Sequence, residues 1–179
     1  MLKQLISLPS TSRNEADTAT LLCNCLKEAG VATVERLHNN VVARSAHWDD
    51  EKPVVMLNSH HDTVKPSNSW TRNPYEPVVE DGRLYGLGSN DAGASVVAAF
   101  IRYDNEPLPF NLLLAISAEE EVGGEHGMRC LIPALGRIDM ALVGEPTSLQ
   151  AALGEKGLVV LDCVAHGVRG HAARNEGVT

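Results

Sequence analysis

Short runs of consecutive apolar residues, separated by stretches with helical character, constrain the fold of this chain more than any other feature. The runs are 54–57, 112–116 and 140–143, and the last two lie within strands expected at 110–117 and 138–143. Unbroken apolar sequence is typical of strands that are covered on both faces, whereas a strand with one solvated face alternates apolar and polar residues. The stretches at 94–103 and at about 125–135 between the runs indicate helices. The alternation predicts an α/β fold, a three-layer sandwich with a mostly parallel central sheet.

The N-terminal part adds a helix and a strand pair. Residues Ser12 to Glu15 have the pattern of a capping box and precede apolar residues at helical spacing, which predicts a helix at about 13–29. Residues 31–37 and 41–45 flank a turn-forming segment and predict two paired strands.

The pattern changes near residue 157, where a further strand is expected at 158–165. We therefore expect a first domain at 1–155, lacking its C-terminal part, and the beginning of a second domain at 156–179.

Composition excludes several classes of protein. Apolar residues make up 44% and charged residues 21% of the 179 residues, as in ordinary globular proteins. The net charge of −8 argues against a nucleic-acid partner, because binding to phosphates needs clustered cations. No apolar stretch approaches the roughly 18–20 residues of a membrane span, and the N-terminus lacks the pattern of a secretory signal. We expect a cytoplasmic protein whose four cysteines are reduced.

Acidic and imidazole side chains follow the predicted strands. Residues His60 to Asp62 end the first run, Glu119 to Glu121 follow the second, and Glu145 follows the third, while Asp91 begins a helix. In an open α/β sheet, ligands bind outside the carboxyl ends of the strands. We therefore expect these side chains to form one cluster.

Such a cluster implies a bound cation, because carboxylates that are forced together repel one another. Nitrogen and oxygen donors without a thiolate fit zinc, cobalt or manganese, and zinc is the first choice. In an extended segment His60 and Asp62 point the same way, which predicts a ligand, His60, oriented by Asp62. Neighbouring extended residues point to opposite sides, so we expect Glu121 to bind metal and Glu120 to act as the general acid–base in metal-assisted amide hydrolysis.

Simpler roles compete for some of these residues. His61 is expected to pack beside the ligand, and His126 to lie at the start of a helix rather than bind metal. Glu119 could serve as the base, although its register with Glu121 favours Glu120. For the whole cluster, the alternative is an acidic sheet edge without metal.

The motifs together resemble the zinc aminoacylase, carboxypeptidase and desuccinylase family, which includes acetylornithine deacetylase and succinyl-diaminopimelate desuccinylase. The resemblance covers nearly the whole chain through these segments: Ser59 to Pro66, Trp70 with Pro74-Tyr75, Asp81 to Asp91, Glu120-Glu121 with Gly123, Gly144-Glu145-Pro146, and Gly170-His171-Ala172.

This resemblance implies two Zn²⁺ or Co²⁺ ions. By it, His60 and Glu145 hold one ion, Asp91 bridges both, Glu121 holds the second, and Glu120 is the base. It also implies a cis peptide after Asp91.

The resemblance further implies that 1–155 is a metal-binding catalytic domain and that 156–179 begins an α+β dimerisation or lid domain. His171 would stabilise the oxyanion in the partner subunit of a homodimer. A C-terminal histidine that completes the second metal site would come later than this sequence. The chain alone is therefore expected to hold the first ion better than the second and to have little or no turnover.

The segment Tyr85 to Ala94 looks most like bacterial acetylornithine deacetylases. This implies a small N-acyl amino acid as substrate, with N-acetylornithine converted to ornithine and acetate in arginine biosynthesis. The alternatives are a succinyl-diaminopimelate desuccinylase, a dipeptidase or carboxypeptidase of the same family, and a non-catalytic scaffold or binding protein that keeps the fold.

Overall fold

The computed structural model describes residues 1–102, 107–154, 157, 159, 161, 163, 164 and 166. The chain divides into two units, Met1–Ser148 and Leu149–Thr179. The described elements, all in the first unit, are in chain order α1 (Leu2–Ser7), α2 (Ala16–Glu28), β1 (Thr33–Leu37), β2 (Asn40–Arg44), β3 (Val54–His60), β4 (Val78–Glu80), β5 (Arg83–Tyr85), α3 (Gly93–Arg102), β6 (Asn111–Ser117), the 3₁₀ helix η1 (Glu120–Val122), α4 (Met128–Leu135) and β7 (Met140–Val143).

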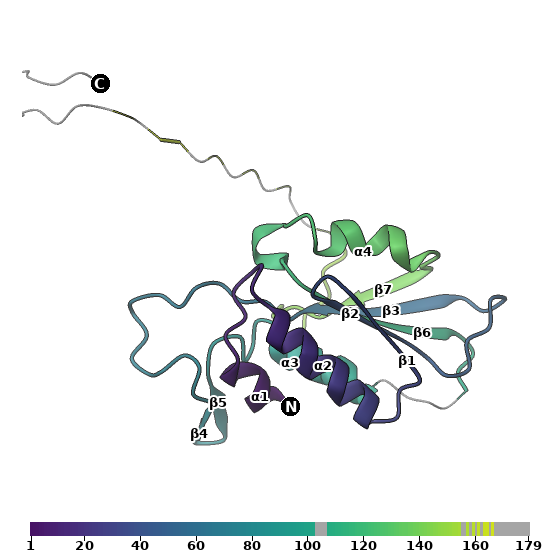
Figure 1. Ribbon diagram of the computed structural model, residues 1–179, viewed down its shortest axis with the longest axis horizontal. Helices are drawn as coiled ribbons and strands as arrows, with labels where there is room; N and C mark the ends of the chain where they lie inside the picture. Colours follow the sequence, from purple (N-terminus) through teal and green to yellow (C-terminus); the bar gives the residue numbers. More distant parts are fainter. Residues whose placement is uncertain are drawn as a thin grey trace, which may run out of the picture. The chain divides into compact units, whose positions relative to one another are not determined.

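Five strands form the central sheet in the order β1-β2-β6-β3-β7 (Figure 1). β3 pairs in parallel with both β6 and β7, whereas β2 is antiparallel to β1 and to β6. Only β2 of these five strands therefore runs against the others. A tight turn joins β1 to β2, which forces an antiparallel pair, whereas parallel strands need the long crossovers that contain α3 and α4. The predicted α/β fold with a mostly parallel core is confirmed.

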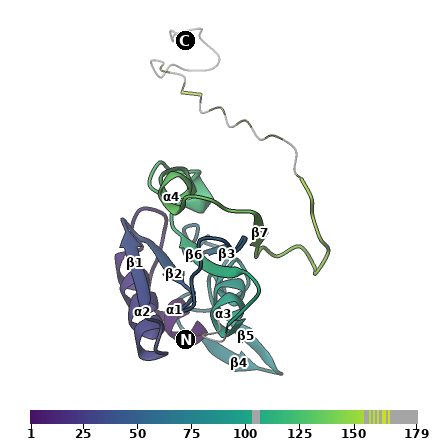
Figure 2. The same cartoon turned by 90° about the vertical axis from the view of Figure 1, so that its right-hand side faces the viewer.

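α1, α2 and α3 cover one face of the sheet (Figures 1 and 2). Leu22 and Leu26 of α2 and Val96 of α3 pack against Leu114 and Ile116 of β6, and none of the five is exposed. Burying each such side chain stabilises the fold by about 1.5–3 kcal/mol. This contact holds the two helices against the central strand.

α4 covers the opposite face. Its residues Leu131 and Leu135 pack with Leu113 and Ala115 of β6. Every residue of β6 is buried, because successive side chains point to opposite faces and each face has its own layer of helix. The continuous apolar run in the sequence therefore has the cause that was expected, and the third layer of the sandwich is present.

The N-terminal helix begins later than expected, at Ala16, and Glu15 occupies the N-cap position. The predicted capping box is wrong, because the Ser12 hydroxyl donates to Asp62 Oδ2 at 2.7 Å instead of capping the helix. Ser12 is thus used in a tertiary contact that the local pattern could not reveal.

The hairpin of β4 and β5 was not predicted. Its turn is Asp81-Gly82, and both residues have positive φ, 49° and 73°. A type I′ turn requires this conformation at both central residues, and Asp-Gly is a frequent sequence for it. This dipeptide was the signal that could have located the hairpin.

In the second unit, the described residues have neither helix nor strand. The strand expected at 158–165 lies in part outside the described residues, and His171 lies wholly outside them. In the part of the chain that the structure describes, every helix is too short or too polar to cross a bilayer.

Candidate metal centre

Three side chains from separate segments converge at the carboxyl ends of the parallel strands. His60 ends β3, Asp91 precedes α3, and Glu121 lies in η1 just after β6. One ligand atom from each of the three lies within 4.8 Å of the other two. The convergence follows from the strand register, which pairs His60 with Ser117 at the end of β6.

Two more carboxylates complete the cluster. His60 Nε2 is 3.0 Å from Asp91 Oδ1, 3.8 Å from Glu120 Oε2 and 3.8 Å from Glu145 Oε2. Ser59 supports Glu145, since its hydroxyl donates to the Gly144 carbonyl at 2.9 Å. We call His60, Asp91, Glu120, Glu121 and Glu145 the acidic cluster.

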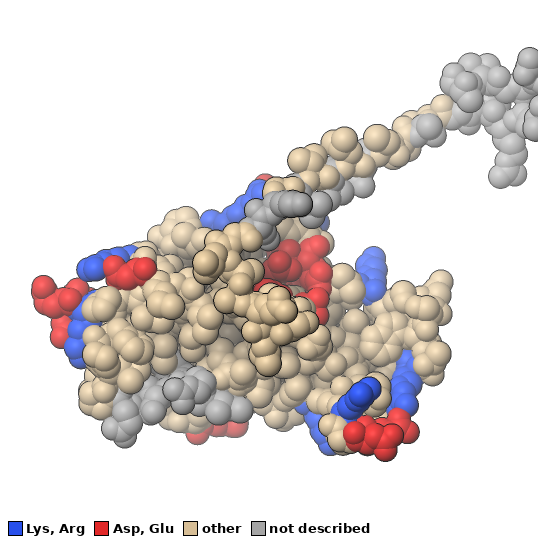
Figure 3. Space-filling view, turned by 180° about the vertical axis from the view of Figure 1, so that it is seen from behind, with Lys and Arg blue, Asp and Glu red and all other residues tan. Residues whose placement is uncertain are grey.

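The acidic cluster is open to solvent above a buried imidazole. The side chain of His60 is 1% exposed, whereas those of Asp91 and Glu120 are 55% and 50% exposed. In the space-filling view from behind, Asp and Glu side chains gather near the middle of the face (Figure 3). A small molecule can therefore approach the carboxylates from one side.

The pKa values of Glu121 and Glu145 are raised in the cluster. Burial raises the pKa of Glu121, and the negative charge of Asp91 raises it further. Burial also raises the pKa of Glu145; His60 lowers it, while Glu120 and Asp91 again raise it. Glu121 and Glu145 are thus less acidic, first through burial and then through neighbouring negative charge, and a cation among the carboxylates would relieve the repulsion.

The imidazole responds in the opposite sense. Burial of His60 lowers its pKa, but Asp62 and the carboxylates of Glu145 and Glu120 outweigh this and raise the pKa to about 9. Without metal, His60 is therefore a cation at neutral pH. A divalent ion binds neutral imidazole and would displace this proton, so the cluster supplies both the donors and the negative charge that such an ion requires. Nitrogen and oxygen donors at these separations fit Zn²⁺ or Co²⁺.

Asp62 lies behind the imidazole, as the spacing indicated. Its carbonyl oxygen is 3.0 Å from His60 Nδ1 and its Oδ1 is 3.4 Å away. Its carboxylate also accepts hydrogen bonds from the amides of Glu120, at 3.1 Å, and Glu121, at 3.2 Å. Burial raises the pKa of Asp62, but the bonds from His60 and Ser12 outweigh this and lower it. Asp62 therefore stays ionised and contacts both His60, at the end of β3, and the segment that follows β6.

Our premise for separating Glu120 from Glu121 is wrong. The two residues begin a 3₁₀ helix rather than an extended segment, and both carboxylates lie at the cluster. The distinction between ligand and base therefore depends on position within the cluster, not on opposite sides of a strand.

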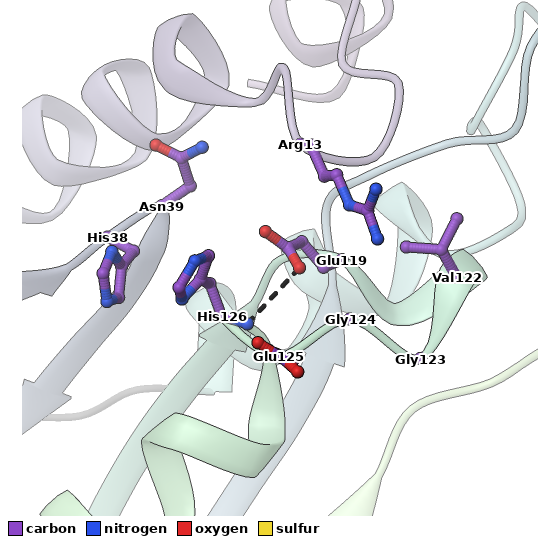
Figure 4. A pocket seen from close by; sticks show the side chains of 9 residues that line it. All are labelled: Arg13, His38, Asn39, Glu119, Val122, Gly123, Gly124, Glu125 and His126. Carbon is purple, nitrogen blue, oxygen red and sulfur yellow. Dashed lines mark hydrogen bonds between the residues drawn. The ribbon is translucent and has the colours of Figure 1, made fainter.

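Glu119 lines a pocket with Arg13 and His126 (Figure 4). Its backbone is left-handed, with φ of 55°, and its Oε2 accepts a hydrogen bond from the His126 amide at 3.3 Å. His126 stacks on His38 with ring centroids 4.3 Å apart. His38 also lines this pocket.

His61 is a packing residue. Its Nδ1 is 2.9 Å from the Thr18 hydroxyl and its Nε2 is 2.9 Å from the Asn39 carbonyl. Burial lowers its pKa to about 4. The ring is neutral at physiological pH and is directed away from the cluster into the protein.

One buried acid near the site was not predicted to have a role there. Glu15, which was expected only to end a capping box, is 0% exposed and accepts a hydrogen bond from the Glu119 amide at 3.3 Å. No local pattern identifies this contact, since it joins residues 104 positions apart. The cis peptide between Asp91 and Ala92 was expected and is present.

A family model and a curated relative each match more than half of this chain. The model of "Peptidase family M20/M25/M40" matches residues 56–165. A succinyl-diaminopimelate desuccinylase of Delftia acidovorans is 29% identical over 197 residues, which span 97% of this chain and 51% of the relative. The chain thus spans about half the length of this curated relative.

Solved structures share the fold. The M20 family metallo-carboxypeptidase Sso-CP2 of Sulfolobus solfataricus superposes with a TM-score of 0.66 and 23% identity, covering 80% of this chain and 36% of that one. YXEP of Bacillus subtilis, a dinuclear metal-binding peptidase of the M20 family, superposes with a TM-score of 0.61 and 19% identity, covering 80% and 40%. With more than half of its residues matched by the family model, the chain belongs to peptidase family M20/M25/M40.

Proposed function

We propose that the chain carries most of the metal site of a metal-dependent amidohydrolase that removes the acyl group from an N-acyl amino acid. The observation that carries this proposal is the convergence of His60, Asp91 and Glu121 within 4.8 Å, with two further carboxylates beside them. Repulsion among these groups makes a bound dication favourable.

The residues of the cluster would serve either as metal ligands or as the general acid–base. His60, Asp91, Glu121 and Glu145 would hold two ions, Zn²⁺ or Co²⁺, with the second site completed by a residue outside this chain. Bound cations of this kind polarise a carbonyl and acidify a water molecule. Glu120 would accept a proton from the attacking water and give it to the leaving amine.

The position of Glu120 suits this role. Its carboxylate is half exposed, so it can meet a substrate, while its backbone amide is fixed by buried Asp62. Asp62 would act by orienting the imidazole of His60 and by staying ionised. It positions ligands and does not touch the substrate.

For the substrate, we propose N-acetylornithine first, which gives ornithine and acetate. The reason is that the sequence of residues 85–94 resembles that of bacterial acetylornithine deacetylases. The 29% identity to a succinyl-diaminopimelate desuccinylase favours a succinylated diamino acid as the second candidate. The two candidates differ in the charge of the acyl group, since succinyl carries a carboxylate that acetyl lacks.

The remaining expectations concern the complete protein. We propose a cytoplasmic homodimer in which His171, from the second unit, contacts the partner's active site and stabilises the oxyanion. A small-molecule substrate, rather than nucleic acid, agrees with the net charge of −8.

The test uses the full-length protein loaded with Zn²⁺ or Co²⁺. Initial rates are measured on N-acetylornithine, N-succinyl-diaminopimelate and a dipeptide, with a chelator-treated sample as the control. Fastest hydrolysis of N-acetylornithine supports the first candidate, and fastest hydrolysis of the succinyl compound supports the second. Hydrolysis of none of the three, by a protein that binds metal, would favour the non-catalytic scaffold.

A further inference from the structure

The loop that carries Glu120 and Glu121 is held by two buried carboxylates from elsewhere in the chain. The amides of Glu120 and Glu121 donate to Asp62, and the preceding amide, of Glu119, donates to Glu15 Oε1 at 3.3 Å. Glu15 and Asp62 are each 0% exposed. Three successive amides therefore donate to buried carboxylates.

The Glu15 carboxylate accepts two further hydrogen bonds. Its Oε1 accepts the amide of Arg13 at 2.5 Å, and its Oε2 accepts Asn39 Nδ2 at 2.9 Å. Asn39 is itself fixed, because its Oδ1 accepts a hydrogen bond from Arg36 at 2.7 Å. Glu15 also occupies the N-cap position of α2, where the helix dipole favours a negative charge. The acceptor is thus rigid and does not depend on the metal.

We propose that Glu15 is a positioning residue for the metal centre: by holding the Glu119 amide, it fixes the left-handed turn from which Glu120 and Glu121 enter the acidic cluster. This inference rests on the proposed function of the cluster. Glu15 does not touch the metal ligands or the substrate and acts only through the backbone.

The conformation of Glu119 explains why the turn needs such support. A φ of 55° is unfavourable for a residue with a side chain and persists only where surrounding contacts enforce it. The Glu119 side chain contributes, because it lies so close to Gly124 that a Cβ there would collide with its carboxylate. The Glu15 bond is the contact that reaches the amide itself. Without it, a buried donor loses its partner, which destabilises the turn.

The experiment measures Co²⁺ affinity and amide exchange in the 179-residue chain. Glu15→Gln keeps the size of the side chain but replaces one oxygen with an NH₂ group, which must face either Asn39 Nδ2 or the amides of Arg13 and Glu119, so a donor opposes a donor in either orientation. We expect Glu15→Gln to weaken Co²⁺ binding on the order of tenfold, the low end for outer partners of metal ligands. We also expect faster exchange at the amides of residues 119–121, with β6 amides unchanged.

A second substitution supplies a rescue. In the double variant Glu15→Gln with Asn39→Asp, the Gln NH₂ group donates to the new carboxylate and the net charge is that of the wild type. Co²⁺ affinity and loop protection should return most of the way. Asp17→Asn is the matched control, because Asp17 lies exposed in the first turn of the same helix; it should change neither readout.

The outcomes separate the alternatives. Wild-type affinity and wild-type exchange in a folded Glu15→Gln variant would overturn the proposal, as would a folded double variant that regains neither. Exchange that rises equally in β6 and in residues 119–121 would indicate a merely structural role. If Glu15→Gln does not fold, Glu15→Asp, which shortens the reach of the carboxylate, takes its place. If the wild type binds no Co²⁺, the metal-centre proposal fails, and amide exchange alone decides the role of Glu15.

Discussion

The carboxylates of the acidic cluster and the carboxylates behind it have opposite surroundings. Behind the cluster, Glu15 and Asp62 are fully buried, and every contact described above for their carboxylates brings a donor. In the cluster, carboxylates face one another around a single imidazole. We call Ser12, Glu15, Thr18, Asn39, His61 and Asp62, which are buried or half-buried, the support network. A charge surrounded by donors stabilises a fold, whereas charges of one sign that face each other indicate a site for a cation.

The two neighbouring histidines show the contrast at its smallest scale. The carboxylates around His60 raise its pKa to about 9, whereas burial lowers the pKa of His61 to about 4. Adjacent residues of one strand end therefore belong to two different environments. The predictions below test this difference, beginning with the largest effect.

Replacing Glu120 with Gln should have the largest effect, on catalysis. The amide cannot accept the proton, so we expect kcat of the full-length protein to fall by about 10²–10⁴. Metal content should stay within experimental error of the wild type. Exposed Glu125, in the same loop, is the matched control, and Glu125→Gln should leave kcat unchanged. Retained activity in Glu120→Gln would mean that another group is the base.

The support network should make stability pH-dependent through His61. Unfolded His61 has a pKa near 6.5 and folded His61 near 4, so below pH 6.5 the unfolded state binds more protons and stability falls as the pH falls. The loss between pH 6.5 and about 4 should reach roughly 3 kcal/mol. Urea denaturation across this range measures it.

Variants of His61 and His47 isolate this contribution. His61→Asn should flatten the dependence, and His47→Gln, at an exposed site, should not. In the metal-free chain His60 has the opposite sign: its contribution is complete below pH 6.5 and is lost as the pH rises through about 9. A stability that rises steadily from pH 5 to 9 without metal would contradict the difference between the two rings.

Metal should stabilise the acidic cluster and not the support network. At a Co²⁺ concentration 100 times Kd, the free energy of unfolding should rise by about 2.7 kcal/mol, and chelation should reverse the change. Glu121→Gln should reduce this gain, because it removes a donor oxygen from the group of three. Glu28→Gln, at the exposed end of α2, should retain the full gain. Equal gains in both variants would exclude Glu121 as a ligand.

The smallest effect concerns Ser12. Removing its hydroxyl with Ser12→Ala takes one donor from ionised Asp62 and should cost about 1.5 kcal/mol, as for hydrogen bonds to charged groups. Thermal denaturation of the metal-free chain measures this. Ser7→Ala, which removes a bond from an exposed hydroxyl to Lys3, should change stability by less than about 0.5 kcal/mol. A similar cost at both serines would indicate that Asp62 does not depend on the Ser12 hydroxyl.

The sequence by itself determined the layers, the strands of the central sheet and the identity of the clustered residues. The apolar run of β6 reports burial on both faces, although that of β7 is exposed, and the carboxyl ends of parallel strands meet at one sheet edge whatever their side chains. The residues that follow β3, β6 and β7 could therefore be assigned to one site before any coordinates.

Tertiary structure alone decided how the site is supported. Ser12 and Glu15 matched a local capping pattern, yet both carry hydrogen bonds to residues 50 and 104 positions away. Likewise, the turn at Glu119 and the 3₁₀ helix after it depend on buried carboxylates outside their own segment. Periodicity records which side of an element is buried, but it does not record which distant partner satisfies a buried polar group, because that partner is chosen only when the layers pack.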